Sequence, residues 1–294
     1  MQLSKILKNV ELVEPISADI EIKNIEFDSR KVGVGSMFVA TRGTAVDGHD
    51  FIAKAIEAGA VAVVCEEFDN AQCTMHNAKS DELNKVVIVK VKDSAEALGR
   101  MASNFYGRPS EQLTLVGVTG TNGKTTIATL LYQLHRALGY KVGLLSTVCN
   151  YVDDNVIEST HTTPDALALN ALLAQMVEAG CQYAFMEVSS HSVDQRRIAG
   201  LKFAGGIFTN LTRDHIDYHK TFDNYLKAKK RFFDELPKGA FAIVNVDDKN
   251  GMVMLQNTRA DKKTYSVRSL ADFTARILEA SFDGMLLNVC NREV

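Results

Sequence analysis

One segment of the sequence has residue types and spacing that suit the binding of a nucleotide's phosphates. Residues 117–126 read Gly-Val-Thr-Gly-Thr-Asn-Gly-Lys-Thr-Thr, and they lie between an apolar run that predicts a strand and a predicted helix. In that context, backbone N–H groups can surround phosphate oxygens at the positive end of the helix. Lys124 supplies a positive charge for the β- and γ-phosphates, and the Thr125 hydroxyl can ligate magnesium. Val118 stands where the common pattern has glycine, so this is a variant of the loop; a plain glycine turn is the weaker alternative.

Two further polar segments follow predicted strands and carry groups that could act on a phosphate. Residues 186–191 contain Glu187, whose carboxylate could hold Mg²⁺. Residues 209–215 contain His215, which could be a second ligand or could position water or phosphate. Taken singly, Glu187 could cap a helix and His215 could be a buried histidine. Ligands of open α/β sheets bind beyond the carboxyl ends of the strands, so the shared placement favours a site facing the phosphate loop.

A basic helix is predicted at residues 222–233. Its cationic residues are Lys227, Lys229, Lys230 and Arg231. The pattern alone favours a solvated basic face. However, Lys229 shares one stripe with Tyr225 and Phe233, because residues four apart lie on the same side of a helix. We therefore predict that Lys229 points inward while its two lysine neighbours face solvent.

The elements that must position these residues alternate between strand and helix. Before residue 107, the patterns predict strands at 37–40, 60–65 and 86–91 and helices at 51–58 and 94–106. After a turn-rich break at 107–110, they predict strands at 113–119, 142–147, 183–188, 206–209 and 241–246, and helices at 124–138 and 164–179. Such alternation implies a mostly parallel sheet with helices on both faces. Pro164 suits the first turn of its helix, and from residue 263 the pattern weakens to short strands.

The composition limits the classes of function. The chain has 294 residues, 46% of them hydrophobic, and a formal net charge of −3, so no broad basic field indicates nucleic acid or a membrane as a partner. The first residues lack the apolar core of a signal peptide, and the longest apolar stretch, 58–65, is too short to cross a bilayer. The five cysteines are scattered, which predicts buried thiols in a reducing, cytoplasmic compartment.

Together these segments resemble the Mur ligase family, specifically its UDP-N-acetylmuramoyl-tripeptide synthetases. The matching text runs in consistent order from Asp28 to Phe233: DSRKVGVGSMFVATRG, DGHDFIAKAIEAGAVAVV, VGVTGTNGKTT, HTTPD, MEVSSHSVDQRRI, FTNLTRDHIDYH and YLKAKKRFF. The resemblance implies an ATP-dependent ligase that adds the third amino acid to UDP-N-acetylmuramoyl-L-alanyl-D-glutamate in peptidoglycan synthesis. For that amino acid, meso-diaminopimelate is favoured over L-lysine by family frequency alone.

The resemblance also implies a role for each matching residue. ATP is expected to contact Gly120, Thr121, Asn122, Gly123, Lys124, Thr125, Thr126, Asn245 and Asp248. One magnesium ion is expected on Thr125 and Glu187, and a second on Glu187, His215 and a carbamate carried by Lys229. The expected catalytic set is Lys124, Glu187, His215 and Lys229. The UDP end is expected to contact Phe27, Ser29, Thr44, Ala45 and Val46, and the muramyl-peptide Thr162, Thr163, Ser189, Gln195 and Arg197.

The implied architecture is α/β. It has a small N-terminal α/β UDP-binding domain at residues 1–107 and a P-loop-type ATP-binding domain, a mostly parallel sheet flanked by helices, at residues 108–294. The family's C-terminal domain, which closes over the amino acid, is not found in the sequence, so we expect this chain to bind nucleotide without full turnover. The complete protein is expected to be a monomer. The chain departs from the family pattern at residues 146–150, and at His161, where some members have asparagine.

Two other functions remain as alternatives. A folylpolyglutamate synthetase shares the loop and the chemistry, but residues 28–43, which resemble a UDP module, disfavour it. A non-catalytic nucleotide-binding remnant is favoured by the short chain and disfavoured by the presence of all four expected catalytic residues. If the chain is a ligase, the substrate carboxylate attacks the γ-phosphate of ATP to give an acyl phosphate, and the incoming amine then displaces phosphate.

Overall fold

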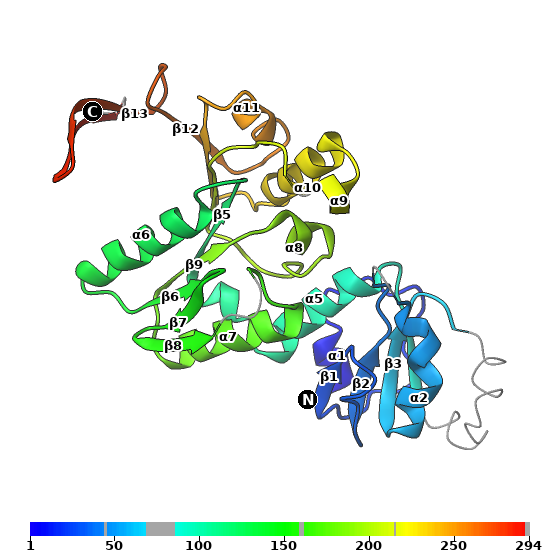
Figure 1. The fold of residues 1–294 in the computed structure, drawn as a ribbon. Coiled ribbons are helices and arrows are strands. Elements are labelled where there is room, and N and C mark those ends of the chain that lie inside the picture. Colours follow the sequence, from blue (N-terminus) through cyan, green and yellow to red (C-terminus); the bar gives the residue numbers. More distant parts are fainter. Residues whose placement is uncertain (44–45, 69–85, 159–161, 215, 292–294) are drawn as a thin grey trace. The chain divides into compact units, whose positions relative to one another are not determined.

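The computed structural model describes residues 1–43, 46–68, 86–158, 162–214 and 216–291, and the chain divides into two compact units. The first unit holds Met1–Arg108, Ala166–Ala171 and Arg196–Leu201, and the second holds Pro109–Asp165, Leu172–Gln195 and Lys202–Val294. Gly107 and Arg108 have φ angles of 75° and 55°, so the chain turns sharply where the first long segment ends. Figure 1 shows the elements of both units.

The first unit is built on a parallel four-stranded sheet in the order β1-β2-β3-β4. Its strands are β1 (Asn24–Glu26), β2 (Ser36–Val39), β3 (Ala60–Cys65) and β4 (Val87–Lys90). Successive residues of β2 point to opposite faces of the sheet. Met37 packs with α1 (Leu3–Ile6) and α5 (Ser94–Phe105) on one face, and Phe38 packs with α2 (Ile52–Glu57) on the other. A short 3₁₀ helix, η1 (Gly48–Phe51), precedes α2. Both faces of this sheet are therefore covered.

The second unit is built, within the described residues, on a ten-stranded sheet in the order β14-β13-β12-β11-β10-β5-β9-β6-β7-β8. Its strands are β5 (Thr114–Thr119), β6 (Val142–Leu145), β7 (Cys149–Val152), β8 (Asn155–Glu158), β9 (Tyr183–Glu187), β10 (Gly205–Phe208), β11 (Phe241–Asn245), β12 (Asp261–Ser266), β13 (Phe273–Ser281) and β14 (Gly284–Asn291). Neighbours pair in parallel from β6 across to β13, and the pairs at the two edges are antiparallel. The prediction of a mostly parallel sheet is confirmed.

Helices cover both faces of the central strands in the second unit, as Figure 1 shows. Val116 and Val118 of β5 pack with α6 (Lys124–Ala137), whereas Gly117 between them faces Phe232 of α10 (Phe222–Asp234). The other helices are η2 (Pro109–Glu111), α7 (Ala166–Glu178), α8 (Ser190–Asp194), α9 (Ile216–His219) and α11 (Gly251–Met254). No helix in the described ranges is long and apolar enough to cross a membrane.

Most predicted elements are found within two residues of their expected bounds, but two expectations were wrong and one hairpin was missed. The helix α7 begins at Ala166, so Pro164 lies before the helix and not in its first turn. The β7–β8 hairpin was not predicted, because β8 is mostly exposed and carries no apolar alternation. The last two strands, β13 and β14, have nine and eight residues where short strands were expected.

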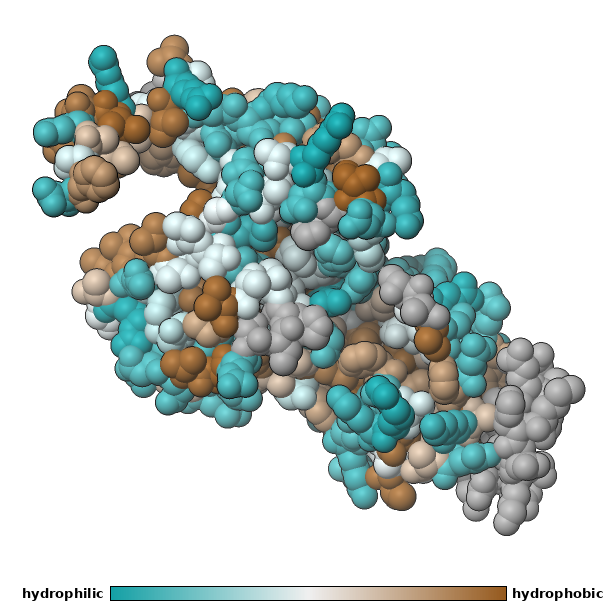
Figure 2. All heavy atoms as spheres, in the orientation of Figure 1, coloured by the Kyte–Doolittle hydropathy of each residue, from teal (hydrophilic) through white to brown (hydrophobic). Residues whose placement is uncertain are grey.

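The β13–β14 hairpin carries apolar side chains that the described residues leave uncovered. Its exposed apolar residues are Ile277, Leu278, Phe282, Met285, Leu286, Leu287 and Val289. Figure 2 shows hydrophobic side chains along this arm. The two strands are held mainly by backbone hydrogen bonds to each other. Because neither face of the hairpin is buried by the described residues, the sequence shows no alternation of apolar and polar residues from which the strand lengths could be predicted.

The described cysteines agree in part with the prediction of buried thiols. Cys65 and Cys181 are buried, Cys149 is half-buried and Cys290 is exposed. Cys73 lies outside the described residues. The prediction of burial was therefore wrong for Cys290, which stands on the exposed hairpin.

Candidate active site

The segment between β5 and α6 forms a tight loop that depends on two glycines. Gly120 has a φ of 152° and Gly123, the N-cap of α6, a φ of 86°, both in the range that favours glycine. A Cβ on Gly120 would lie 1.9 Å from Thr209 Oγ1, so a side chain has no room there. The loop therefore leads directly into the first turn of α6, whose N–H groups have no partner within the helix.

The segment that follows β10 holds this loop in place. The N–H of Thr121 donates to Asn210 O at 2.8 Å, and the N–H of Asn122 donates to Asn210 Oδ1 at 3.0 Å. Thr209 Oγ1 donates to Asn122 O at 2.7 Å, and the N–H of Thr212 donates to Thr121 Oγ1 at 2.9 Å. The expectation that the residues after this strand face the phosphate loop is confirmed.

Lys124, the first residue of α6, folds back over the loop. Its Nζ donates to Gly120 O at 3.0 Å and to Thr121 O at 2.9 Å. Burial lowers the pKa of this amine, and the carboxylates of Glu187 and Asp214 oppose that shift. The amine is thus held by two carbonyl oxygens directly at the loop.

Glu187, the last residue of β9, is a buried carboxylate with several hydrogen-bond donors around it. It is 1% exposed. Thr125 Oγ1 donates to its Oε1 at 2.9 Å, and the N–H of Thr147 donates to the same oxygen at 2.7 Å. Thr147 Oγ1 lies 3.2 Å from Oε2. These donors satisfy a charge that would otherwise be costly to bury, and they fix the carboxylate beside the first turn of α6.

Lys229 on α10 points inward, as its stripe with Tyr225 and Phe233 predicted; all three side chains are buried, and Lys229 is 1% exposed. Its Nζ donates to Gly120 O at 2.9 Å and lies 4.9 Å from the centre of the Tyr225 ring. Burial lowers the pKa of Lys229 well below its ordinary value, the charge of Lys124 adds to this, and Asp214 opposes it. The loop thus has a second amine beside it, one that gives up its proton easily.

The two lysines that flank this position behave differently from each other. Lys227 is exposed, as predicted. Lys230 was predicted to face solvent, but its side chain is 13% exposed. It pairs with Asp234, whose Oδ1 lies 2.6 Å from its Nζ, because residues four apart meet on a helix.

Two family models match most of the chain. A model described as the Mur ligase middle domain matches residues 118–293, and a model described as the Mur ligase family, catalytic domain, matches residues 21–106. The chain belongs to the Mur ligase family. The resemblance found in the loop and strand-end segments is thereby confirmed.

Relatives of this Mur ligase chain are considerably longer than it is. The UDP-N-acetylmuramoyl-L-alanyl-D-glutamate–2,6-diaminopimelate ligase of Parabacteroides distasonis is 60% identical over 298 residues, which cover 100% of this chain and 59% of the relative. A solved structure of a ligase with the same name has a TM-score of 0.77 at 26% identity, and the match covers 100% of this chain and 58% of that one. The chain therefore spans about 59% of the length of the curated relative.

A more distant solved structure shares the fold of part of the chain. It is a Mycobacterium tuberculosis folylpolyglutamate synthase complexed with ADP and AMPPCP. Its TM-score is 0.52 at 15% identity, and the match covers 66% of this chain and 51% of that one. At this identity, the likeness shows a common fold and nothing further.

Three residues expected on the muramyl-peptide side of a Mur ligase lie together next to Glu187. Thr163 Oγ1 donates to Glu187 O at 2.9 Å, and the N–H of Ser189 donates to Thr163 Oγ1 at 3.4 Å. Thr162 Oγ1 lies 3.1 Å from Thr147 Oγ1. The turn after β9 and the segment before α7 therefore meet at the same strand end as the carboxylate.

The other expected ligand contacts of the second unit form hydrogen bonds with Tyr218 and with the segment that follows β10. Gln195 Nε2 donates to Tyr218 OH at 3.2 Å. Asn245 Nδ2 donates to Thr209 O at 3.0 Å, and Asp248 Oδ2 accepts the N–H of Leu211 at 2.7 Å. Asn245 and Asp248 thus support the segment that holds the phosphate loop. Arg197 belongs to the first compact unit.

The residues expected at the UDP end of a Mur ligase also belong to the first unit. Phe27 and Ser29 follow β1, and Phe27 packs partly buried against the core. Val46 is exposed. Thr44 and Ala45 lie outside the described residues.

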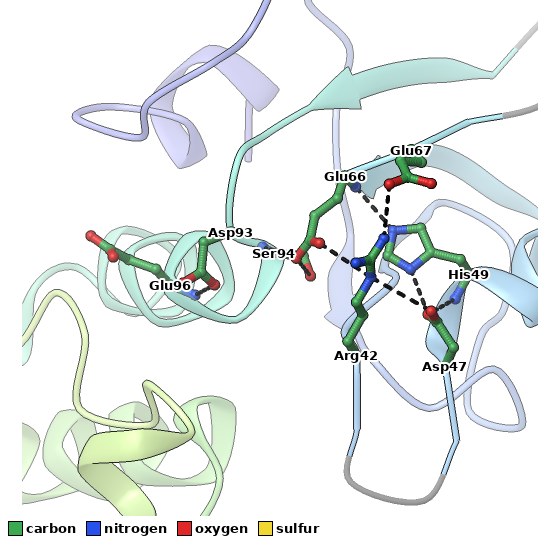
Figure 3. Close-up of polar contacts among 8 residues, drawn as sticks. All are labelled: Arg42, Asp47, His49, Glu66, Glu67, Asp93, Ser94 and Glu96. Atoms are coloured by element: carbon green, nitrogen blue, oxygen red, sulfur yellow. Dashed lines mark hydrogen bonds and ion pairs between the residues drawn. The ribbon is translucent and has the colours of Figure 1, made fainter. Parts of the chain in front are cut away.

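A polar network, shown in Figure 3, holds the chain at Arg42 and Asp47, on either side of residues 43–46. Arg42 Nε lies 3.5 Å from Asp47 Oδ2 and 3.3 Å from Glu66 Oε2. The N–H of Glu66 donates to His49 Nε2 at 3.0 Å, so the ring proton is on Nδ1, 2.6 Å from Asp47 Oδ1. Glu66 Oε1 also accepts the N–H and hydroxyl of Ser94 at the start of α5.

Two groups near the loop were given no role by the sequence analysis. The charge of Asp214 acts on both Lys124 and Lys229. The Tyr225 hydroxyl lies 3.1 Å from Thr121 Oγ1; burial raises the pKa of Tyr225 to about 12, the hydrogen bond to Thr121 opposes this, and Asp214 adds to it. The sequence did contain a signal for Asp214, because this residue stands in the polar segment that follows β10 and was expected to face the phosphate loop.

The oxygen donors beside the loop suit magnesium. Thr125 Oγ1 and Glu187 Oε1 are 2.9 Å apart, and hard oxygen ligands are those that Mg²⁺ prefers. In the part of the chain that the structure describes, no three His, Cys, Asp or Glu side chains form a metal site by themselves. Phosphate oxygens and water would complete the coordination, as is usual for Mg²⁺. His215, expected at a second ion, lies outside the described residues.

Proposed function

We propose that this chain carries the UDP-substrate-binding and ATP-binding parts of a ligase that adds meso-diaminopimelate to UDP-N-acetylmuramoyl-L-alanyl-D-glutamate in peptidoglycan synthesis. The observation that carries the proposal is the meeting of Lys124, Glu187 and Lys229 at one phosphate loop. The name of the relative at 60% identity supports the choice of both substrates, including diaminopimelate over lysine.

The proposed ATP site uses the N–H groups at the start of α6. The N–H groups of Thr121 and Asn122 already donate to Asn210, so the phosphate donors are those from Gly123 onward. Lys124 is proposed to exchange its two carbonyl acceptors for phosphate oxygens. Charged acceptors make the stronger hydrogen bonds, so this exchange favours binding.

Thr125 and Glu187 are the proposed ligands of one magnesium ion, and Glu187, His215 and a carbamate on Lys229 those of a second. Bound magnesium would neutralise charge on the phosphates. A carbamate forms when an uncharged amine makes an N–C bond to carbon dioxide and releases a proton. The lowered pKa of Lys229 supports this step, because it raises the uncharged fraction at neutral pH.

In the proposed reaction, the substrate carboxylate takes the γ-phosphoryl group of ATP, which leaves as ADP, and the amine of diaminopimelate then displaces phosphate from the acyl phosphate, loses a proton and forms the amide. Thr162, Thr163 and Ser189 are proposed to hold the muramyl-peptide so that this carboxylate stands near the phosphate loop. Gln195 and Arg197 are proposed as further contacts of the same substrate.

We also propose residues 1–107 as the domain for the uridine end of the substrate and residues 108–294 as the ATP-binding domain. The division of compact units at Arg108 and the gap between the two family matches support this boundary. The proposed uridine contacts are Phe27, Ser29, Thr44, Ala45 and Val46.

A folylpolyglutamate synthetase-like function has less support. The solved synthase of that class shares the fold at 15% identity over 66% of the chain. The family match at residues 21–106 includes the segment 28–43 that resembles a UDP module. No contact in the described residues favours a folate over a UDP-linked substrate.

Calorimetric titration tests the proposal through binding, which suits a chain that spans 59% of its relative. With magnesium in excess, we expect Lys124→Ala to weaken ATP binding about 10- to 100-fold, because a charge-assisted hydrogen bond to phosphate is lost. The exposed lysine variant Lys227→Ala is the matched control and should bind as the wild type does.

Two outcomes would contradict the proposal. Equal ATP affinity of the wild type and Lys124→Ala would remove the phosphate-loop assignment. Absence of binding between the wild type and UDP-N-acetylmuramoyl-L-alanyl-D-glutamate, in a separate titration, would remove the substrate assignment.

A further inference from the structure

Thr147 connects the carboxylate of the candidate site to the threonines on the muramyl-peptide side. It lies in the loop that follows β6. Its N–H donates to Glu187 Oε1 at 2.7 Å. Its hydroxyl oxygen lies 3.2 Å from Glu187 Oε2 and 3.1 Å from Thr162 Oγ1. One side chain therefore touches a proposed magnesium ligand and a proposed substrate contact at once.

The single hydroxyl proton of Thr147 can be donated to one of these neighbours at a time. A carboxylate accepts hydrogen bonds without donating, whereas a threonine hydroxyl does both. In the first arrangement, Thr147 donates to Glu187 Oε2. In the second, Thr147 donates to Thr162, and Glu187 Oε2 loses its hydroxyl donor. The two arrangements use the same oxygen positions and differ in where the hydroxyl proton of Thr147 points.

We propose that Thr147 is a positioning residue that couples substrate binding at Thr162 to magnesium binding at Glu187; this inference rests on the proposed function. When an oxygen of the muramyl-peptide accepts a hydrogen bond from the Thr162 hydroxyl, the Thr162 oxygen can accept a hydrogen bond from the Thr147 hydroxyl. Glu187 Oε2 then has its lone pairs available for a cation. Oε1 keeps the N–H of Thr147, so the carboxylate keeps its orientation.

The exposure of the three residues supports this coupling. Glu187 is 1% exposed, so water has little access to replace a lost hydroxyl donor at its oxygens. Thr162 is half-buried and Thr147 is exposed, so a substrate can reach the hydroxyl of Thr162. Because Thr147 is exposed, replacing it by valine does not disturb the core.

Linked titrations of the 294-residue chain test the proposal. The affinity for ADP with magnesium is measured by calorimetry with and without saturating UDP-N-acetylmuramoyl-L-alanyl-D-glutamate. The ratio is the coupling factor, and the reverse titration must give the same value. For the wild type, we expect the UDP-linked dipeptide to tighten magnesium–ADP binding about 5-fold or more, and to do so less when magnesium is removed by chelation.

The variants separate the hydroxyl from the rest of the side chain. Thr147→Val keeps the N–H donor and the shape but has no hydroxyl, so the coupling factor should fall close to 1. Thr162→Val should have the same effect, and the double variant should add nothing further. Thr147→Ser should retain the wild-type factor. The neighbouring Val148, which is 73% exposed, provides the control Val148→Ala, which should also retain it.

The result identifies which assignment is wrong. If the wild type binds both ligands and the coupling factor is 1, or is the same in Thr147→Val, the inference is overturned. If the wild type fails to bind either the UDP-linked dipeptide or magnesium–ADP, the proposed function fails and the inference falls with it. Unfolding temperatures of all variants check that a lost coupling does not come from a lost fold.

Discussion

Glu187 and Lys229 in the second unit are each 1% exposed, whereas Arg42 and Asp47 in the first unit keep 50% and 41% of their side chains exposed. Burial of a charged group carries a desolvation cost, and removing its partners leaves that cost uncompensated. Half-exposed ion pairs share their partners with water and contribute little to stability. The comparison indicates that the buried charges depend strongly on their partners, whereas the exposed network, which joins Arg42 to Asp47 and Glu66, contributes little to stability.

The largest effect is expected at Glu187. Glu187→Ala leaves the Thr125 hydroxyl and both donors of Thr147 without their acceptor, so the free energy of unfolding should fall by about 2 to 3 kcal/mol. Urea unfolding measures this. The exposed Glu178 at the end of α7 offers the control Glu178→Ala, which should change stability by less than about 0.5 kcal/mol. Similar losses in the two variants would show that the buried carboxylate is not held as described.

A gain of stability is expected at Lys229. Lys229→Met removes a buried amine without leaving Gly120 O unpaired, because Lys124 also donates to that oxygen. The free energy of unfolding should rise by about 1 to 2 kcal/mol at neutral pH. The exposed variant Lys227→Met is the control and should show no such gain.

The gain at Lys229 should depend on pH. Its folded-state pKa is lowered, so between that value and the unfolded value of about 10.4 the unfolded chain binds the proton more tightly. Wild-type stability therefore rises with pH in this window, and the advantage of Lys229→Met shrinks towards pH 10. An advantage that stays constant across the window would contradict the lowered pKa.

The smallest effect is expected at Arg42. Arg42→Ala removes ion pairs to Asp47, Glu66 and Glu67, all of which water can reach. We expect a loss of stability smaller than either change above, and one that vanishes at about 1 M salt, where exposed charges are screened. The control is Arg259→Ala, at an exposed arginine. A large, salt-independent loss would mean that the first unit depends on this network for its folding.

Local sequence patterns predicted most of the helices and strands, because apolar periodicity and the glycines of a turn involve residues that are close together in the sequence. The apolar run of β3 and the Gly-Lys-Thr ending at α6 were found where expected. The stripe on α10 predicted the burial of Lys229. The same stripe argument missed the burial of Lys230, because that depends on its pairing with Asp234.

Contacts between distant segments could not be predicted in this way. Thr147 reaches Glu187 because β6 and β9 pair in parallel, which no local pattern reports. Asp214, in the segment that follows β10, acts on Lys124 and Lys229, which lie on two different helices. The roles of the uridine and muramyl-peptide contacts came from family resemblance and stay predictions.

The close approach of Gly120 and Thr209 makes the two positions depend on each other under mutation. A Cβ at Gly120 would lie 1.9 Å from Thr209 Oγ1, and that hydroxyl also donates to Asn122 O at 2.7 Å. Changing Gly120 first creates a clash, and truncating Thr209 first removes a hydrogen bond that holds the loop. The effects of substitutions at the two positions are therefore coupled. A Cβ at Gly120 would also lie 3.0 Å from the backbone oxygen of Asn210, so a smaller residue at position 209 would relieve only part of the clash.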